Sequence, residues 1–123
     1  MKPDFSDAWY NKGVAHAQLQ KYSEAINCFD KAIELKSYYS VAWYNKGATL
    51  GNLGKYKEAI KCYEKVNEIN PFFYDAWYNN GIDHGKIGKY LEAVKCFKKA
   101  AKLENRFFRN KIFYWYQFLS LLN

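Results

Sequence analysis

Apolar and small side chains recur at steps of three and four residues along most of the chain, which is the spacing of one face of an α-helix. A first, short stripe consists of Trp9, Gly13, His16 and Leu19. A second stripe follows and consists of Tyr22, Ala25, Ile26, Phe29, Ala32 and Ile33. The pattern predicts two consecutive helices joined by a short turn.

This pair of stripes repeats with a period of 34 residues. One motif appears three times, as "DAWYNKG" at 7–13, "VAWYNKG" at 41–47 and "DAWYNNG" at 75–81. A fixed period of this size is typical of repeat proteins, in which each helix pair stacks on its neighbours to bury its apolar faces. We expect the pairs to begin near Ser6, Ser40 and Tyr74. The expected single domain, 1–123, divides into repeats at about 6–39, 40–73 and 74–107 and a terminal helix at about 108–122.

The turn inside each helix pair falls at a glycine in two of the three repeats. Gly54 and Gly88 stand where a left-handed residue ends many helices, and Gln20 takes this place in the first repeat. A residue with a side chain costs on the order of 1 kcal/mol in that conformation. We therefore predict that Gln20 has a left-handed backbone and is a weak point of the first repeat.

A second set of glycines lies within the first helix of each pair, at positions 13, 47 and 81. Glycine inside a helix costs about 1 kcal/mol relative to alanine, so a close contact must offset this cost. The pattern predicts that the facing helix makes this contact through its small residues, Ala25, Ala59 and Ala93.

Composition and charge change this picture little. Half of the 123 residues are apolar and one fifth are aromatic, so the chain can bury a core. No stretch reaches the ~20 apolar residues of a membrane-spanning helix, and we expect no membrane partner. The formal net charge is +7, but the lysines are spread over repeated positions, which favours solvated helix faces over one dense basic patch.

Three cysteines occupy the same place in the three repeats, at positions 28, 62 and 96. Equivalent positions of stacked helix pairs lie roughly 10 Å apart. A disulfide needs Cα atoms within about 7 Å. We therefore expect reduced, packed thiols and a cytoplasmic protein.

The sequence offers no chemistry typical of an enzyme or a metalloprotein. It contains no glycine-rich phosphate loop and no cluster of His, Cys, Asp or Glu at catalytic or ligand spacing. His16 and His84 are two repeats apart, too far to share a metal. We expect no catalytic residue, no metal and no cofactor.

The order of the recurring residues resembles the tetratricopeptide repeat. Each unit has Trp, then Gly four residues later, then Tyr-x-x-Ala, and an aromatic residue four positions after that Ala. The resemblance covers roughly residues 6–107 and implies an all-α fold, a right-handed α-solenoid of antiparallel helix pairs. It also implies a protein-interaction scaffold, in which the first helices line a concave groove that binds a peptide or a helix of a partner.

The resemblance, with the packing face set by Trp9 and Gly13, predicts which side chains line this groove. The candidate peptide-binding residues are Tyr10, Asn11, Val14, Tyr44, Asn45, Ala48, Tyr78, Asn79, Ile82 and Lys86. The tyrosines form a stripe of rings, and the asparagine amides can donate to and accept from a peptide backbone. Small residues beside them leave room for a ligand, namely Ala17, Gly51 and Gly85.

One binding mode of the family is not expected here. Co-chaperone members clamp a C-terminal carboxylate with Lys, Asn and Arg side chains. The matching positions in this chain are Tyr10, Val14, Asn45, Asp75 and Asn79. Only Asn45 agrees with the clamp, and Asp75 would repel a carboxylate.

Two alternatives remain open. The positive charge and the segment "RFFRNKIFYWYQ" would suit single-stranded nucleic acid, although aromatic residues at helical spacing more often pack. The other alternative is a purely structural or self-assembling repeat module.

The terminal helix has one apolar stripe, Trp115, Phe118 and Leu122, and a second, Ile112, Tyr116 and Leu119. We expect the second stripe to contact another copy of the chain, or a following repeat in a longer parent protein, because exposed apolar patches usually mark an interface.

Overall fold

A computed structural model describes the backbone of residues 5–122 and the side chains of this range except 107–112 and 114–116. The described range holds six helices and no strand, which confirms the all-α prediction. The helices are α1 (Ser6–Gln18), α2 (Tyr22–Leu35), α3 (Ser40–Asn52), α4 (Tyr56–Ile69), α5 (Tyr74–Lys86) and α6 (Tyr90–Leu121). Helices α1, α3 and α5 begin at the three predicted residues.

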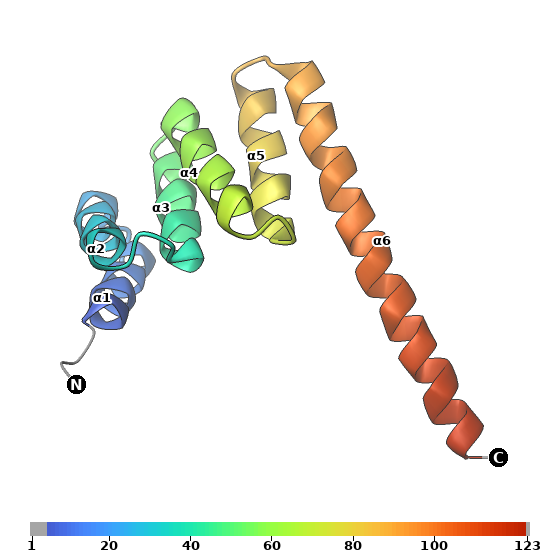
Figure 1. Cartoon of the computed structure of the whole chain (residues 1–123). Coiled ribbons are helices and arrows are strands. Elements are labelled where there is room, and N and C mark those ends of the chain that lie inside the picture. The colour runs from blue at the N-terminus through green and yellow to red at the C-terminus, as the bar shows by residue number, and fades with distance from the viewer. Residues whose placement is uncertain (1–4, 123) are drawn as a thin grey trace.

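The helices form antiparallel pairs that stack side by side (Figure 1). Helix α1 packs on α2, α3 on α4 and α5 on α6, while α2 contacts α3 and α4 contacts α5. Successive first helices also touch, α1 with α3 and α3 with α5. Within the described residues, no Cα atom of α2 lies within 8 Å of one in α4, and the same is true of α4 and α6. The array is therefore an α-solenoid with α1, α3 and α5 on the inner side of its curve.

The predicted terminal helix is the continuation of the second helix of repeat three. Helix α6 runs without a break over 32 residues and extends away from the stacked pairs (Figure 1). Repeat two ends at Pro71, which cannot continue a helix, but the equivalent position in repeat three is Asn105. Because no proline or glycine follows within α6, nothing in the sequence stops the helix.

The turns inside the helix pairs have the predicted left-handed residue. Gly54 and Gly88 have φ angles of 76° and 81°, and Gln20 has a φ of 61°. The amide of the next residue, Lys21, closes this turn by donating to the His16 carbonyl at 2.8 Å. The prediction for the Gln20 backbone is confirmed.

Replacing Gln20 with glycine should raise the melting temperature. The left-handed conformation costs a residue with a Cβ on the order of 1 kcal/mol, and Gln20→Gly removes that cost. Gly54→Ala is the matched variant, since it places a Cβ in the same conformation and should lower the melting temperature. Thermal unfolding followed by circular dichroism measures both, and a less stable Gln20→Gly protein would contradict the prediction.

The mid-helix glycines face aromatic rings, not the predicted alanines. Cβ atoms built on the glycines of repeats one, two and three would lie 2.6, 2.8 and 2.6 Å from the rings of Phe29, Tyr63 and Phe97, respectively. Each ring stands one helical turn beyond the alanine of its stripe and reaches across to the glycine. The expectation that Ala25, Ala59 and Ala93 make this contact is therefore wrong.

A buried cluster is centred on the second repeat, which has a neighbour on both sides. It consists of Leu50, Ala59, Cys62, Tyr63, Val66 and Ala76. Tryptophan side chains fix the connections between repeats. The Trp43 indole N–H donates to the Ser37 carbonyl at 2.9 Å, and the Trp77 indole N–H donates to the Pro71 carbonyl at 2.8 Å.

Candidate peptide-binding face

The ten predicted groove residues all lie on α1, α3 and α5, the inner helices of the curve. Asn11, Tyr78 and Lys86 are exposed. The others are half-buried, namely Tyr10, Val14, Tyr44, Asn45, Ala48, Asn79 and Ile82. Because none of the ten is fully buried, each contributes to the surface of what we call the inner face.

Two of the three asparagines link adjacent repeats. The Asn45 amide donates to the Tyr10 hydroxyl and to the Val41 carbonyl, both at 2.9 Å. The Asn79 amide donates to the Tyr44 hydroxyl at 2.8 Å. Both donor hydrogens of Asn45 and one of Asn79 are therefore used within the protein, and the side-chain carbonyls remain as acceptors. The asparagine ladder thus joins the repeats, a role that the sequence analysis did not assign to it.

The tyrosines of the stripe pack against other rings. The ring of Tyr10 lies 5.2 Å from that of Tyr39, and the ring of Tyr44 lies 5.1 Å from that of Phe73, measured between centroids. Burial raises the pKa of Tyr44, so its hydroxyl stays neutral. Tyr78 is 44% exposed, so the ring surface available to a ligand is concentrated at the third repeat.

The Asn-to-Tyr links leave one open group at each end of the inner face. The hydroxyl that Asn45 or Asn79 reaches belongs to the preceding repeat, and Asn11 lies in the first of the described repeats. The position 34 residues after Asn79 is Phe113, which carries no amide. Among the described side chains, neither the Asn11 amide nor the Tyr78 hydroxyl forms a hydrogen bond. Both groups are available to a ligand.

A buried carboxylate lies beside the inner face and was not singled out from the sequence. Asp83 on α5 is 6% exposed, and its Oδ2 atom has no hydrogen-bond partner among the described residues. A Cβ atom built on Gly51 would lie 3.5 Å from this oxygen, so the carboxylate sits close to α3. Burial raises the pKa of Asp83 to about 6, while His84 and Lys86 oppose the shift.

The cysteines have the properties of packing residues. Cys28, Cys62 and Cys96 are free and buried. Burial raises the pKa of the Cys62 thiol to about 11, so the thiol is neutral and a poor nucleophile at neutral pH. The residues that the structure describes contain no group of three or more His, Cys, Asp or Glu side chains placed to hold a metal ion. Over the same residues, no helix has the length and hydropathy needed to cross a bilayer.

Family models cover most of the chain. A model described as "Tetratricopeptide repeat" matches residues 6–39 and 40–73, and a second model with the same description matches residues 74–107. A comparison with curated protein sequences finds no match.

Solved structures with the same fold include crystal structures of MamA. One matches with a TM-score of 0.83 at 33% identity over 85% of this chain and 61% of that chain. MamA from Desulfovibrio magneticus matches with a TM-score of 0.76 at 29% identity over 81% of this chain and 56% of that chain. The chain thus spans less than two thirds of these two MamA chains.

A more distant structure carries a bound peptide. The second tetratricopeptide repeat domain of Spaghetti (RPAP3), bound to the HSP90 peptide SRMEEVD, matches with a TM-score of 0.77 at 21% identity over 80% of this chain and 91% of that chain. These structures confirm the predicted right-handed α-solenoid. From the three matched units and the shared fold, we conclude that the chain belongs to the tetratricopeptide repeat family.

Proposed function

We propose that the chain is a scaffold that binds an extended or helical peptide segment of a protein partner on its inner face. Family membership supports a protein-interaction module, and one structure of the same fold holds a peptide. The main support for this location comes from the end of the inner face at Tyr78. There an exposed ring and an unused hydroxyl adjoin the half-buried Ile82 and the exposed Lys86.

The nucleic-acid alternative rests on the segment "RFFRNKIFYWYQ", most of whose side chains lie outside the described residues. Its first residue, Arg106, lies over the Phe72 ring at 5.5 Å, a contact within the protein. Salt titration separates the two functions, because binding to phosphates weakens steeply with salt. A cytoplasmic location stays a prediction from the reduced thiols.

Blocking the inner face should abolish capture of the partner. Ala48 is half-buried in the middle of α3, so Ala48→Trp adds a bulky ring where a peptide would lie. We expect capture of the partner by the immobilised chain to fall about 100-fold, as steric exclusion removes most of the contact. Replacing Asn45 and Asn79 with alanine is a less clean test, because it also removes the links between repeats.

Lys57→Trp is the matched control for this experiment. Lys57 is exposed on α4, away from the inner helices, so the same ring there should leave capture unchanged. Partners that the wild-type chain and Lys57→Trp retain and Ala48→Trp loses are identified by mass spectrometry. Equal capture by all three proteins would move the binding site off the inner face.

We also propose that the far end of α6 contacts a second copy of the chain. At 1.5 Å per residue α6 is about 48 Å long, whereas its partner α5 has only 13 residues. Apolar residues along this end are exposed, namely Phe113, Phe118, Leu119, Leu121 and Leu122. The other two residues of the predicted stripe, Ile112 and Tyr116, lie outside the described side chains. An apolar face of this kind usually marks an interface.

Self-association should therefore depend on protein concentration. We expect the mass from light scattering coupled to size exclusion to rise from monomer towards dimer with concentration, the simplest arrangement being two-fold. The variant Ile112→Lys with Leu119→Lys should stay monomeric. A wild-type chain that remains monomeric at the highest concentration would refute the proposal.

A further inference from the structure

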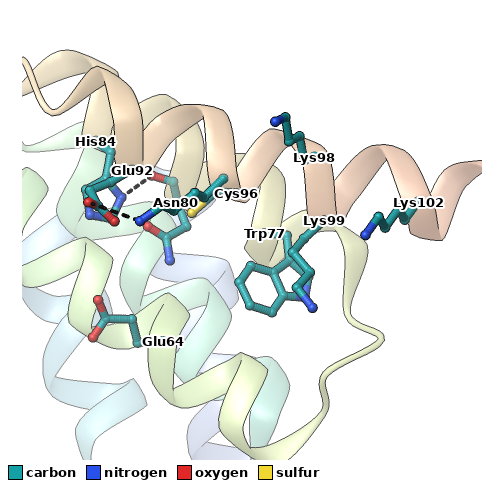
Figure 2. Close-up of a pocket in the computed structure, with 10 residues that line it drawn as sticks. Glu64, Trp77, Asn80, His84, Glu92, Cys96, Lys98, Lys99 and Lys102 are labelled. Atoms are coloured by element: carbon teal, nitrogen blue, oxygen red, sulfur yellow. Dashed lines mark hydrogen bonds and ion pairs between the residues drawn. The ribbon is translucent and has the colours of Figure 1, made fainter.

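A pocket of about 470 Å³ opens where α4, α5 and α6 meet, and its residues come from the faces of α5 and α6 that the inner face does not use (Figure 2). Helix α5 contributes Trp77, Asn80 and His84, and α4 contributes Glu64. Most of the remaining wall is a row of lysines on α6, namely Lys95, Lys98, Lys99 and Lys102. Figure 2 shows Lys98, Lys99 and Lys102 on α6, with Lys99 next to the Trp77 ring and Lys98 pointing away from it.

The net positive charge of this row is absent from the other repeats, where the lysines alternate with Asp or Glu. In repeats one and two, the equivalent turns carry ion pairs within one helix, Lys31 with Glu34 at 3.5 Å and Lys65 with Glu68 at 3.7 Å. In repeat three the corresponding residues are Lys99 and Lys102, two positive charges. The described side chains provide neither of these lysines with an ion pair.

A second contrast lies at the junction between repeats. Lys46 on α3 reaches back to Asp30 on α2 at 2.7 Å and ties repeat two to repeat one. At the junction of repeats two and three, the equivalent residues are Asn80 and Glu64, which face the pocket and form no such pair. Lys98 is in turn the equivalent of Asp30, so an acidic position has become basic. Repeat three thus lacks the counterparts of these ion pairs, and Lys98, Lys99 and Lys102 have no ion pair among the described side chains.

A polar atom inside the pocket also lacks a partner. Asn80 is 3% exposed, and its Oδ1 atom forms no hydrogen bond among the described residues. Buried polar groups of this kind nearly always have a partner, so a donor from a ligand or from water is expected at Asn80 Oδ1. The Trp77 ring beside it is held by its hydrogen bond to the Pro71 carbonyl, with the Lys99 ammonium 5.9 Å from the ring.

We propose that this pocket binds an acidic segment of a protein partner. The carboxylates of the segment pair with Lys98, Lys99 and Lys102, a backbone N–H donates to Asn80 Oδ1, and an apolar side chain packs on the Trp77 indole. Lys95 is already 3.8 Å from Glu92 and contributes less. A peptide fits better than a nucleic acid, because the pocket also contains the carboxylates of Glu64 and Glu92. A nucleic acid carries a negative charge on every residue, whereas a peptide can place a neutral residue opposite them.

The probe for this site is a fluorescein-labelled heptapeptide of alternating Glu and Leu, titrated with the full chain and followed by anisotropy. The test variant is Lys98→Glu with Lys102→Glu, which restores the acidic residues that repeat two carries at these positions. We expect it to keep the wild-type melting temperature and to raise the Kd for the peptide at least about tenfold. The charge-matched control is Lys21→Glu with Lys55→Glu, at exposed turn positions, which should leave the Kd within about twofold of the wild type.

Several outcomes would overturn the proposal. One is a wild-type chain that does not bind the probe, or that binds a Gln and Leu heptapeptide equally well. Another is an equal loss of binding in the test and control variants, which would mean that only net charge attracts the peptide. Loss of binding in Ala48→Trp would place the peptide on the inner face instead. Tighter binding of a thymidine oligonucleotide, lost in the test variant, would assign the pocket to nucleic acid.

Discussion

Replacing Gly47 with alanine should lower the free energy of unfolding by about 2 kcal/mol, even though alanine is the better helix former. The added Cβ would lie 2.8 Å from the Tyr63 ring and 3.1 Å from Cys62 Cβ. Tyr63 is 2% exposed, so its ring has no free space to move into, and the Cys62 Cβ cannot shift without its backbone. Chemical denaturation followed by circular dichroism measures the loss.

Gly85→Ala is the control, because a Cβ built on Gly85 would have no atom within 4 Å other than those of its chain neighbours and its own helix backbone. There the gain in helix propensity is unopposed, and stability should rise by roughly 0.5–1 kcal/mol. Gly81→Ala should fall between the two, since the facing Phe97 is 37% exposed and its ring can move. If Gly47→Ala is as stable as Gly85→Ala, the ring contact does not explain the glycine.

The parts of the fold that depend on local sequence could be predicted. The 34-residue period placed the helix starts, and comparison with Gly54 and Gly88 identified the left-handed Gln20. The length of α6 could not be predicted, because a missing proline permits a helix to continue without requiring it. The contact of Gly47 with Tyr63 was also missed, since a periodic pattern shows which residues share a face but not which side chain reaches farthest.

The candidate sites also contain features that the sequence predicts and features that it does not. The tyrosine and asparagine stripes are visible in the sequence, but the bond from Asn45 to Tyr10 joins residues 35 positions apart and follows only from how the repeats stack. Two of the pocket lysines on α6 and Asp83 could have been found in another way. At these positions the charge of the residue differs from that of the equivalent residues in the other repeats. Lys98 stands where the other repeats have acids, and Asp83 stands where they have Ala15 and Thr49. Departures from the repeat, read position by position, would have located both.

Removing the Asp83 carboxylate should stabilise the protein at pH 8 and abolish one step in its pH dependence. Burial raises the pKa of Asp83 to about 6 in the folded chain, above the ordinary value of about 3.9 in the unfolded chain. A raised folded-state pKa means that folding favours the protonated acid. Its contribution is complete below about pH 4 and is lost as the pH rises through 6.

The variant Asp83→Thr copies repeat two, where the Thr49 hydroxyl donates to the Asn45 carbonyl at 2.7 Å. The new hydroxyl can donate to the Asn79 carbonyl in the same way, so no buried polar atom is left unpaired. We expect the variant to exceed the wild type by about 1–2 kcal/mol at pH 8, and the difference to shrink towards zero at pH 4. Urea denaturation at both pH values measures it, with Glu104→Gln as the control, because that exposed acid should give the wild-type profile. A constant difference between the variant and the wild type at both pH values would show that the carboxylate does not titrate as described, and that the gain comes from packing alone.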